Sequence, residues 1–233
     1  MSDGSLTAPG RRARTIEAAA VAGIVSAVLG TLALLAVDRY PSLSLNDEEL
    51  TRWFDDATNQ AWLIGGLTLM SFSSIAFLWF VAVIRRRLGD LEDRFFGTVF
   101  FGSAIACVVI QLVGAAAAAA PATATNVLDA ATVSPTSMSL AGGFAAALLL
   151  GVLPRIQAVF VFTTSSVILR SGVLPRWVAL LGYVTGLLLI VIPIVRRPMA
   201  LPFELWVLLV SVGLLVVRRP RADRAAPPPR ARP

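Results

Sequence analysis

The chain has 233 residues, of which 57% are hydrophobic and 15% are charged, and its mean hydropathy is +0.78. A soluble domain carries about 25% charged residues, so the composition excludes that class and indicates an integral membrane protein. With no histidine and one cysteine, Cys107, the chain cannot form an internal disulfide, a Cys/His zinc site or a Ser-His triad. Cys107 lies in an apolar run, which predicts a buried thiol.

Six apolar segments of roughly 20 residues or more are long enough to cross a hydrocarbon core of about 30 Å as helices. They are residues 16–37, 61–84, 95–120, 138–169, 177–195 and 199–217. The sequence therefore predicts an all-α fold, a polytopic transmembrane helical bundle of about six spans, preceded by a tail at 1–15. Residues 218–233 are rich in arginine, proline and alanine, and we expect a disordered basic tail there.

The distribution of arginine predicts the orientation, because basic residues beside spans are retained on the cytoplasmic side. With the N-terminus inside, fifteen of the 20 basic residues fall in cytoplasmic segments and four in outer ones. We therefore expect both termini in the cytoplasm and the chain in an inner (plasma) membrane. Arg196 and Arg197, in the last outer turn, go against the rule. All the basic residues are arginine, which suggests GC-rich, bacterial coding DNA.

These arginines also indicate the partners of the protein. They gather at the ends of apolar segments beside the inner face, where anionic lipids attract basic side chains by about 1 kcal/mol each. They do not form one basic face on a soluble domain, which argues against nucleic acid as a partner.

Small residues recur every four positions in two of the predicted spans. The first span has Ala19, Gly23 and Ala27, and the fifth has Gly182 and Gly186 in a GxxxG motif. In lipid, small residues let helix backbones approach closely and pack. We expect both stripes in interfaces within the bundle, with homodimerisation through the second as the alternative.

The loop after the first span predicts a short helix of its own, over residues 46–57. Asn46 is a good N-cap, and Glu49 stands three residues later, as in a capping box. Trp53 and Phe54 lie on the apolar face of this helix. Two interpretations stay open: a structural cap on the bundle, which we favour, and a binding lid.

The motif GVLPR occurs twice, at 151–155 inside the fourth span and at 172–176. In the second copy, Gly172 ends a helix and Pro175 fits the first turn of the next. In the first copy, Pro154 predicts a kink within one long helix. A re-entrant hairpin or two short spans are the alternatives.

Five polar side chains inside the predicted spans form the candidate intramembrane site. They are Ser71, Gln111, Arg155, Gln157 and Glu204. An unpaired arginine within a span is costly, so it should face the bundle and find a partner. Counting from the inner arginines puts Arg155 and Glu204 about 22 and 21 Å up their helices. We therefore expect Arg155 to be buried and paired with Glu204.

The stretch SGVLPRW, Ser171–Trp177, together with the apolar segments after it, resembles the end of an uncharacterised bacterial family of small multi-span membrane proteins, classed as a domain of unknown function. The likeness covers most of residues 16–219. It implies the same six-span architecture and carries no active site over to this chain.

The chain lacks the phosphate-binding, dinucleotide-binding, zinc-protease and serine-hydrolase motifs, so we expect neither an enzyme nor a cofactor. We expect a membrane protein that binds or scaffolds, such as an accessory subunit. The alternative is a small-solute or ion carrier or channel whose polar path runs past Arg155 and Glu204. The small number of polar residues within the spans favours the first.

Overall fold

The computed structural model describes residues 8–42, 44–88, 94–128, 133–191 and 201–216. In these ranges the regular structure is helical and contains no strand, which confirms the predicted all-α class. The elements are α1 (Ala8–Val37), α2 (Asp47–Asp55), α3 (Ala57–Leu88), α4 (Arg94–Asn126), α5 (Pro135–Ala146), the π-helical η1 (Ala147–Val152), α6 (Leu153–Ser171), α7 (Arg176–Val191) and α8 (Leu201–Val216).

Within the described ranges, four helical stretches are long and apolar enough to cross a membrane, which indicates a membrane-embedded protein. They are Glu17–Val37, Ala57–Arg85, Gly97–Asn126 and Pro135–Ser171. The other two predicted spans correspond to α7 and α8, of 16 residues each, or about 24 Å. Both predicted spans run on into residues outside the described ranges, as does the predicted tail at 218–233. Helix α1 begins at Ala8, before its apolar part, which runs over Glu17–Val37.

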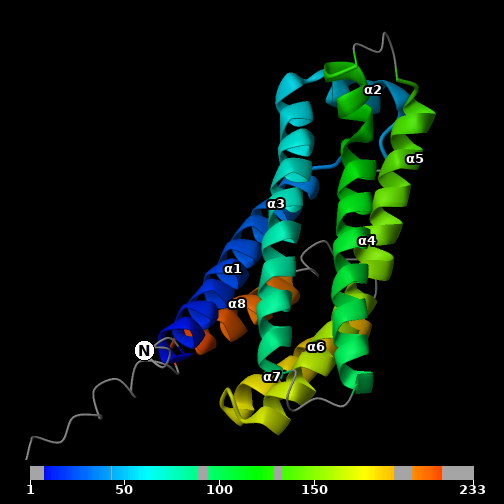
Figure 1. Ribbon diagram of the computed structural model, residues 1–233. Coiled ribbons are helices and arrows are strands. Elements are labelled where there is room, and N and C mark those ends of the chain that lie inside the picture. Colours follow the sequence, from blue (N-terminus) through cyan, green and yellow to red (C-terminus); the bar gives the residue numbers. More distant parts are fainter. Residues whose placement is uncertain (1–7, 43, 89–93, 129–132, 192–200, 217–233) are drawn as a thin grey trace, which may run out of the picture.

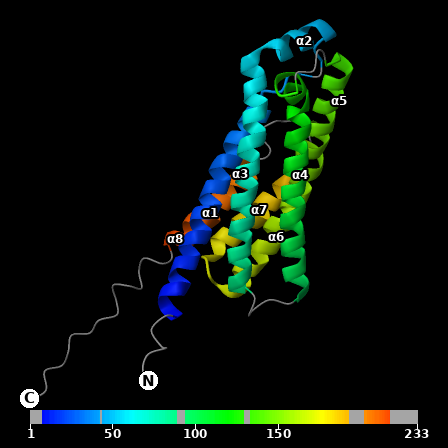
Figure 2. The same cartoon turned by 45° about the horizontal axis from the view of Figure 1, so that its top comes forward.

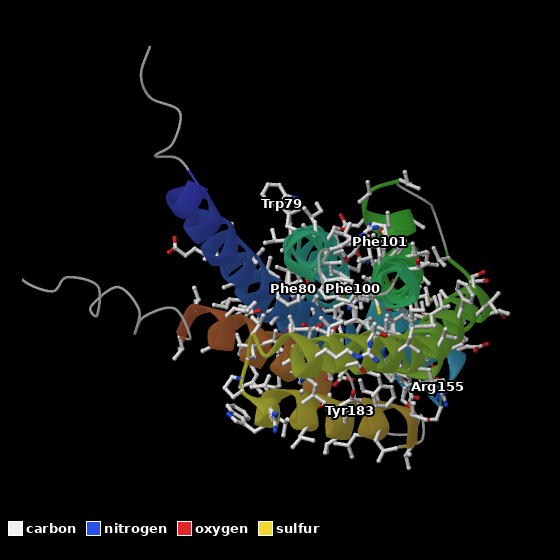
Figure 3. The ribbon with its side chains drawn as sticks, turned by 60° about the horizontal axis from the view of Figure 1, so that its bottom comes forward. Trp79, Phe80, Phe100, Phe101, Arg155 and Tyr183 are labelled. Atoms are coloured by element: carbon white, nitrogen blue, oxygen red, sulfur yellow. The ribbon has the colours of Figure 1, made fainter. Side chains whose placement is uncertain are left out.

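The helices pack side by side into a closed ring. Helix α1 packs against α3 and α8, α3 against α4, α4 against α5 and α6, α6 against α7, and α7 against α8. Figure 1 shows α3, α4 and α5 upright beside one another, and Figure 2 shows α2 across their upper end. In Figure 3, α3 and α4 are seen nearly end-on while α6 and α7 are seen along their length, so the later helices run crosswise to the earlier ones.

The fourth predicted span is one unbroken helical stretch with a change of direction at η1 (Figure 1). Pro154 stands in the first turn of α6, where it has no N–H to donate to the preceding turn. The wider π-helical turn before Pro154 accommodates the missing N–H. In this turn the Leu153 N–H donates to the carbonyl of Leu148, five residues earlier. The prediction of a single kinked helix is confirmed. The second GVLPR copy is also as predicted: Gly172 ends α6 with φ of 62°.

Aromatic side chains fill the centre of the ring. The Phe160 ring of α6 lies 5.2 Å from Phe77 of α3, 5.1 Å from Phe100 of α4 and 6.1 Å from Phe203 of α8, between ring centroids. Figure 3 shows Phe80 and Phe100 directed inward, whereas their neighbours Trp79 and Phe101 are directed outward. One aromatic cluster therefore ties four helices together.

Both stripes of small residues lie in internal interfaces, as predicted. A Cβ at Gly23 would overlap Ser211 of α8 and Phe80 of α3. A Cβ at Gly182 would overlap Ser165 of α6 and would lie 2.7 Å from Nε1 of Trp206. The second stripe is thus used within the protein, which leaves it no free face for the alternative of homodimerisation.

The predicted loop helix is present as α2. The Asn46 side chain accepts the Glu49 N–H at 2.9 Å, and the Glu49 carboxylate accepts the Asn46 N–H at 3.2 Å, so the capping box is complete. Leu50 and Phe54 are buried against Leu63 of α3 and neighbouring residues of α4 and α5. This burial supports the interpretation of α2 as a structural cap.

Candidate functional site

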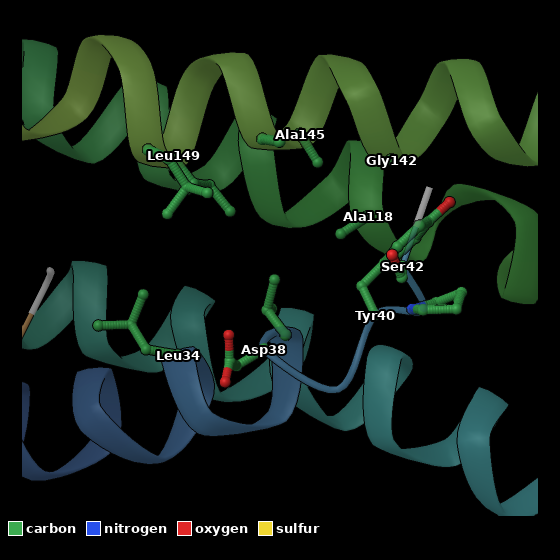
Figure 4. Close-up of a pocket in the computed structure, with 12 residues that line it drawn as sticks. Leu34, Asp38, Tyr40, Ser42, Ala118, Gly142, Ala145 and Leu149 are labelled. Atoms are coloured by element: carbon green, nitrogen blue, oxygen red, sulfur yellow. The ribbon is translucent and has the colours of Figure 1, made fainter. Parts of the chain in front are cut away.

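A cavity of about 320 Å³ lies between α1 and the α5–η1 helix, near the end of the bundle that α2 covers (Figure 4). Its wall is formed by Leu34, Val37, Asp38, Tyr40, Pro41, Ser42, Ala118, Gly142, Ala145, Ala146, Leu149 and Leu150. The cavity exists because the facing positions of α4 and α5 are alanine and glycine. A volume in this range suits a small ligand.

The polar groups of this cavity gather at one end, where the chain leaves α1. Among the described residues of the wall, Asp38 is the only acidic one and none is basic, and Figure 4 shows the Asp38 carboxylate between α1 and the helix opposite. Tyr40 donates its hydroxyl to the Met138 carbonyl oxygen. Burial raises the pKa of Tyr40 to about 12, against a smaller opposite effect of the Gly142 backbone, so the phenol stays neutral. The cavity is therefore amphipathic, with one negative group.

A second notable group is the carboxylate of Glu204, which is only 3% exposed in the first turn of α8. It rests on Gly30 of α1: a Cβ there would lie 2.8 Å from Oε1 and 3.0 Å from Oε2. The Cys107 thiol of α4 is within electrostatic range of this carboxylate. Across the described ranges, no hydrogen bond or ion pair joins Glu204 to another residue.

The predicted pairing of Arg155 with Glu204 is wrong. Arg155 is exposed on α6 (Figure 3), and its guanidinium donates to the Gly151 carbonyl, one turn back on its own chain. The depth count failed because it gave only the height along each helix and not the face that carries the residue: Arg155 lies on an exposed face of α6, whereas Glu204 lies on a buried face of α8.

The other three predicted polar residues have different surroundings. Gln157 is completely buried, and neither atom of its amide has a hydrogen-bond partner in the described chain. Gln111 is 4% exposed on α4. Ser71 is half-buried and donates to the Leu67 carbonyl of its own helix at 2.9 Å. The ring interior thus contains Gln111, Gln157 and Glu204, and leaves out Arg155.

Sequence reasoning missed the amphipathic cavity and the contact at Gly30. One signal was present: Gly30 and Leu34 continue the spacing of the small residues in the first span. The partner of Tyr40 is Met138, 98 residues away, and nothing local could have indicated it.

Searches against protein families, curated proteins and solved structures give no match for this chain. The resemblance of SGVLPRW to a family of small membrane proteins stays a prediction. The site must therefore be interpreted from its own geometry.

Proposed function

We propose that the chain is a six-span protein of an inner (plasma) membrane with both ends of its helical domain at the cytoplasmic face. Helices α1 and α8 are antiparallel, since Gly30 faces Glu204 and Gly23 faces Ser211, so the start of one lies beside the end of the other. The arginine distribution of the sequence supports the cytoplasmic side for that end.

Two exposed tryptophans on α3 support a bilayer position in which the hydrocarbon core lies between them. Trp62 and Trp79 are separated by about 26 Å along the helix, close to the thickness of the hydrocarbon core. Arg39 lies 4.1 Å above the Trp62 ring, and Arg85 lies 4.5 Å above that of Phe101. Aromatic and basic residues of this kind mark membrane interfaces. The polar end of the cavity, beside Arg39, is then level with the outer interface.

Cysteine labelling tests this topology. In a Cys107→Ser background, single cysteines at Asn59 and Arg196 should react with a membrane-impermeant maleimide in intact cells, and one at Gly172 only in inverted vesicles. Labelling of Asn59 but not Arg196 from outside would mean that α7 and α8 do not cross. Labelling of Gly172 in intact cells would overturn the orientation.

Within this membrane, we propose that the protein binds a small amphipathic organic cation in the cavity between α1 and α5, without catalysing a reaction. The observation that carries the proposal is the cavity itself: its deep wall is apolar, and its single acidic group, Asp38, stands at the interfacial end. An apolar body gains from leaving water, and its positive group gains from the carboxylate. Exposed Arg85, Arg170 and Arg176 support additional binding of anionic headgroups at the other face.

Fluorescence titration of the purified protein in nanodiscs with a styrylpyridinium dye, a flat monovalent cation, tests the binding proposal. The unmethylated parent of the dye has almost the same shape without the charge and should bind about tenfold more weakly. Ala145→Phe fills the cavity and should weaken dye binding at least about tenfold. The control, Ala147→Phe, makes the same change at an exposed position two residues away and should leave binding unchanged.

Ala118→Leu fills the cavity from the α4 side and gives a second test if Ala145→Phe folds poorly. Equal binding by Ala145→Phe and Ala147→Phe, or by the charged dye and its neutral parent, would overturn the proposal.

A further inference from the structure

A second cavity, of about 240 Å³, lies at the opposite end of the ring interior, enclosed by α1, α3, α6 and α8. It is lined by Ala19, Val83, Ile84, Thr164, Val167, Ile168, Ser171, Val173, Leu174, Val210 and Leu214. In the proposed orientation it is at the cytoplasmic end. The protein therefore has one cavity near each membrane face.

One face of α1 connects the two cavities. Ala19 lines the inner cavity, and Leu34 and Asp38 line the outer one. Between them, at the same helical spacing, stand Gly23, Ala27 and Gly30. This face covers about 28 Å from Ala19 to Asp38, comparable with the hydrocarbon core.

Helix α8 covers the middle of this face. Ser211 lies against Gly23 near the inner cavity, and Glu204 lies against Gly30, one turn below Leu34 of the outer cavity. The facing residues of α1 are small, so α8 approaches closely and its Ser211 and Glu204 side chains occupy the space that a Cβ on Gly23 or Gly30 would need. Small sliding of packed helices is one of the ways in which proteins change conformation.

The interior of the bundle contains buried polar atoms that have no hydrogen-bond partner in the described residues, and two of them, on Ser165 and Trp206, lie beside Gly182 of α7. The unpaired atoms are Ser74 Oγ, Gln157 Oε1 and Nε2, Ser165 Oγ and Trp206 Nε1. A buried polar atom without a hydrogen-bond partner destabilises the fold, because it has lost its hydrogen bonds to water. Such unpaired polar atoms are expected in an interior through which a polar or charged ligand passes.

We infer that the protein carries its amphipathic cation between the two cavities along the α1–α8 seam, with Glu204 as the intermediate binding group. The inference rests on the proposed function, because the outer cavity is its first binding site. A cation in a low-dielectric interior needs a negative partner, and a buried carboxylate with no basic partner among the described residues becomes favourable as an anion when a cation binds beside it. Glu204 lies between the cavities and meets both conditions, and Arg155, outside the ring, does not compete for it.

Dye uptake into proteoliposomes, measured beside dye binding, tests the carrier. Wild-type protein should accumulate the styrylpyridinium dye when the membrane potential is negative inside, and not its neutral parent. Glu204→Gln keeps the shape of the side chain and removes its charge. It should bind dye at the outer cavity within about twofold of wild type and lose at least about tenfold in uptake rate.

Filling the inner cavity gives an independent variant. Ala19→Phe occupies space that the cation needs on leaving, so uptake should fall while binding is kept. Ala18→Phe, at the adjacent exposed position of α1, is the matched control and should behave as wild type. Thermal unfolding of each variant verifies that the ring is intact.

The outcomes separate the two proposals. Dye binding without uptake by wild-type protein, or uptake by Glu204→Gln at the wild-type rate, overturns the carrier and leaves the binding protein standing. Absence of charge-dependent dye binding to wild-type protein overturns the proposed function, and the carrier with it.

Discussion

The two ends of the bundle are stabilised in different ways. At the outer end, α2 is held by a capping box, Gln60 accepts a hydrogen bond from Asn126 at 3.0 Å, and Tyr40 donates to Met138. At the inner end, side chains of α6 and α8 pack directly on glycines of α7, as Ser165 and Trp206 do on Gly182.

This difference shows how the two cavities can behave differently. The outer cavity has fixed polar groups and a capped rim, so we expect it to keep its shape when the proposed ligand binds. The inner cavity is bounded mainly by apolar side chains of α1, α3, α6 and α8, and packing of this kind allows small shifts between helices. We therefore expect perturbations at each end to stay local.

The largest expected effect comes from removing the anchor of the cap. Phe54 is 1% exposed and packs edge-on against Tyr40 and Trp53. Phe54→Ala should destabilise the outer end by about 3 to 5 kcal/mol. Hydrogen exchange in nanodiscs should show faster exchange in α2, with α6 to α8 unchanged. Equal acceleration at both ends would show that the two regions unfold as one unit.

The inner end is tested next by adding a methyl group. Gly182→Ala forces Ser165 and Trp206 apart and should cost about 1 to 3 kcal/mol in thermal unfolding. Gly102→Ala is the control, because nothing lies within 4 Å of its Cβ, and it should be neutral or stabilising by up to about 1 kcal/mol. If both variants lose the same stability, close packing does not distinguish the inner end.

A smaller effect should follow from removing the cap residue alone. Asn46→Ala leaves the Glu49 N–H without its acceptor and should cost about 1 kcal/mol, confined to the start of α2. Thr58→Ala, at an exposed position outside α2, is a suitable comparison. Exchange in α2 that is already fast in wild-type protein would contradict an ordered cap.

The smallest expected effect is the energetic coupling between Arg155 and Glu204 in a double variant. Arg155 and Glu204 lie in separate surroundings, so the losses of stability in Arg155→Gln and Glu204→Gln should add to within about 0.5 kcal/mol in the double variant. Arg155→Gln alone removes one exposed bond to the Gly151 carbonyl. If the double variant is more stable than the sum of the two single losses predicts, Arg155 and Glu204 do form the ion pair that the sequence predicted.

Much of the architecture could be predicted from the sequence because its signals are local. Apolar length indicated the helices, Asn46 and Glu49 indicated α2, Gly172 indicated a helix end, and Pro154 indicated a kink. The candidate site was predicted less well. Gln111, Gln157 and Glu204 are indeed buried, but their distance from Arg155 depends on how much the chain turns at η1.

By itself, then, the sequence determined that the helices are apolar enough for a lipid membrane, where they lie in the chain, and which small residues they pack on. These properties follow from hydrophobicity, helix capping and small-residue spacing, which act over a few neighbouring residues. The tertiary structure alone decided that Gly30 faces Glu204, that Tyr40 reaches Met138 and that α1 connects two cavities. These contacts join residues far apart in the chain, and they depend on crossing directions that no local pattern records.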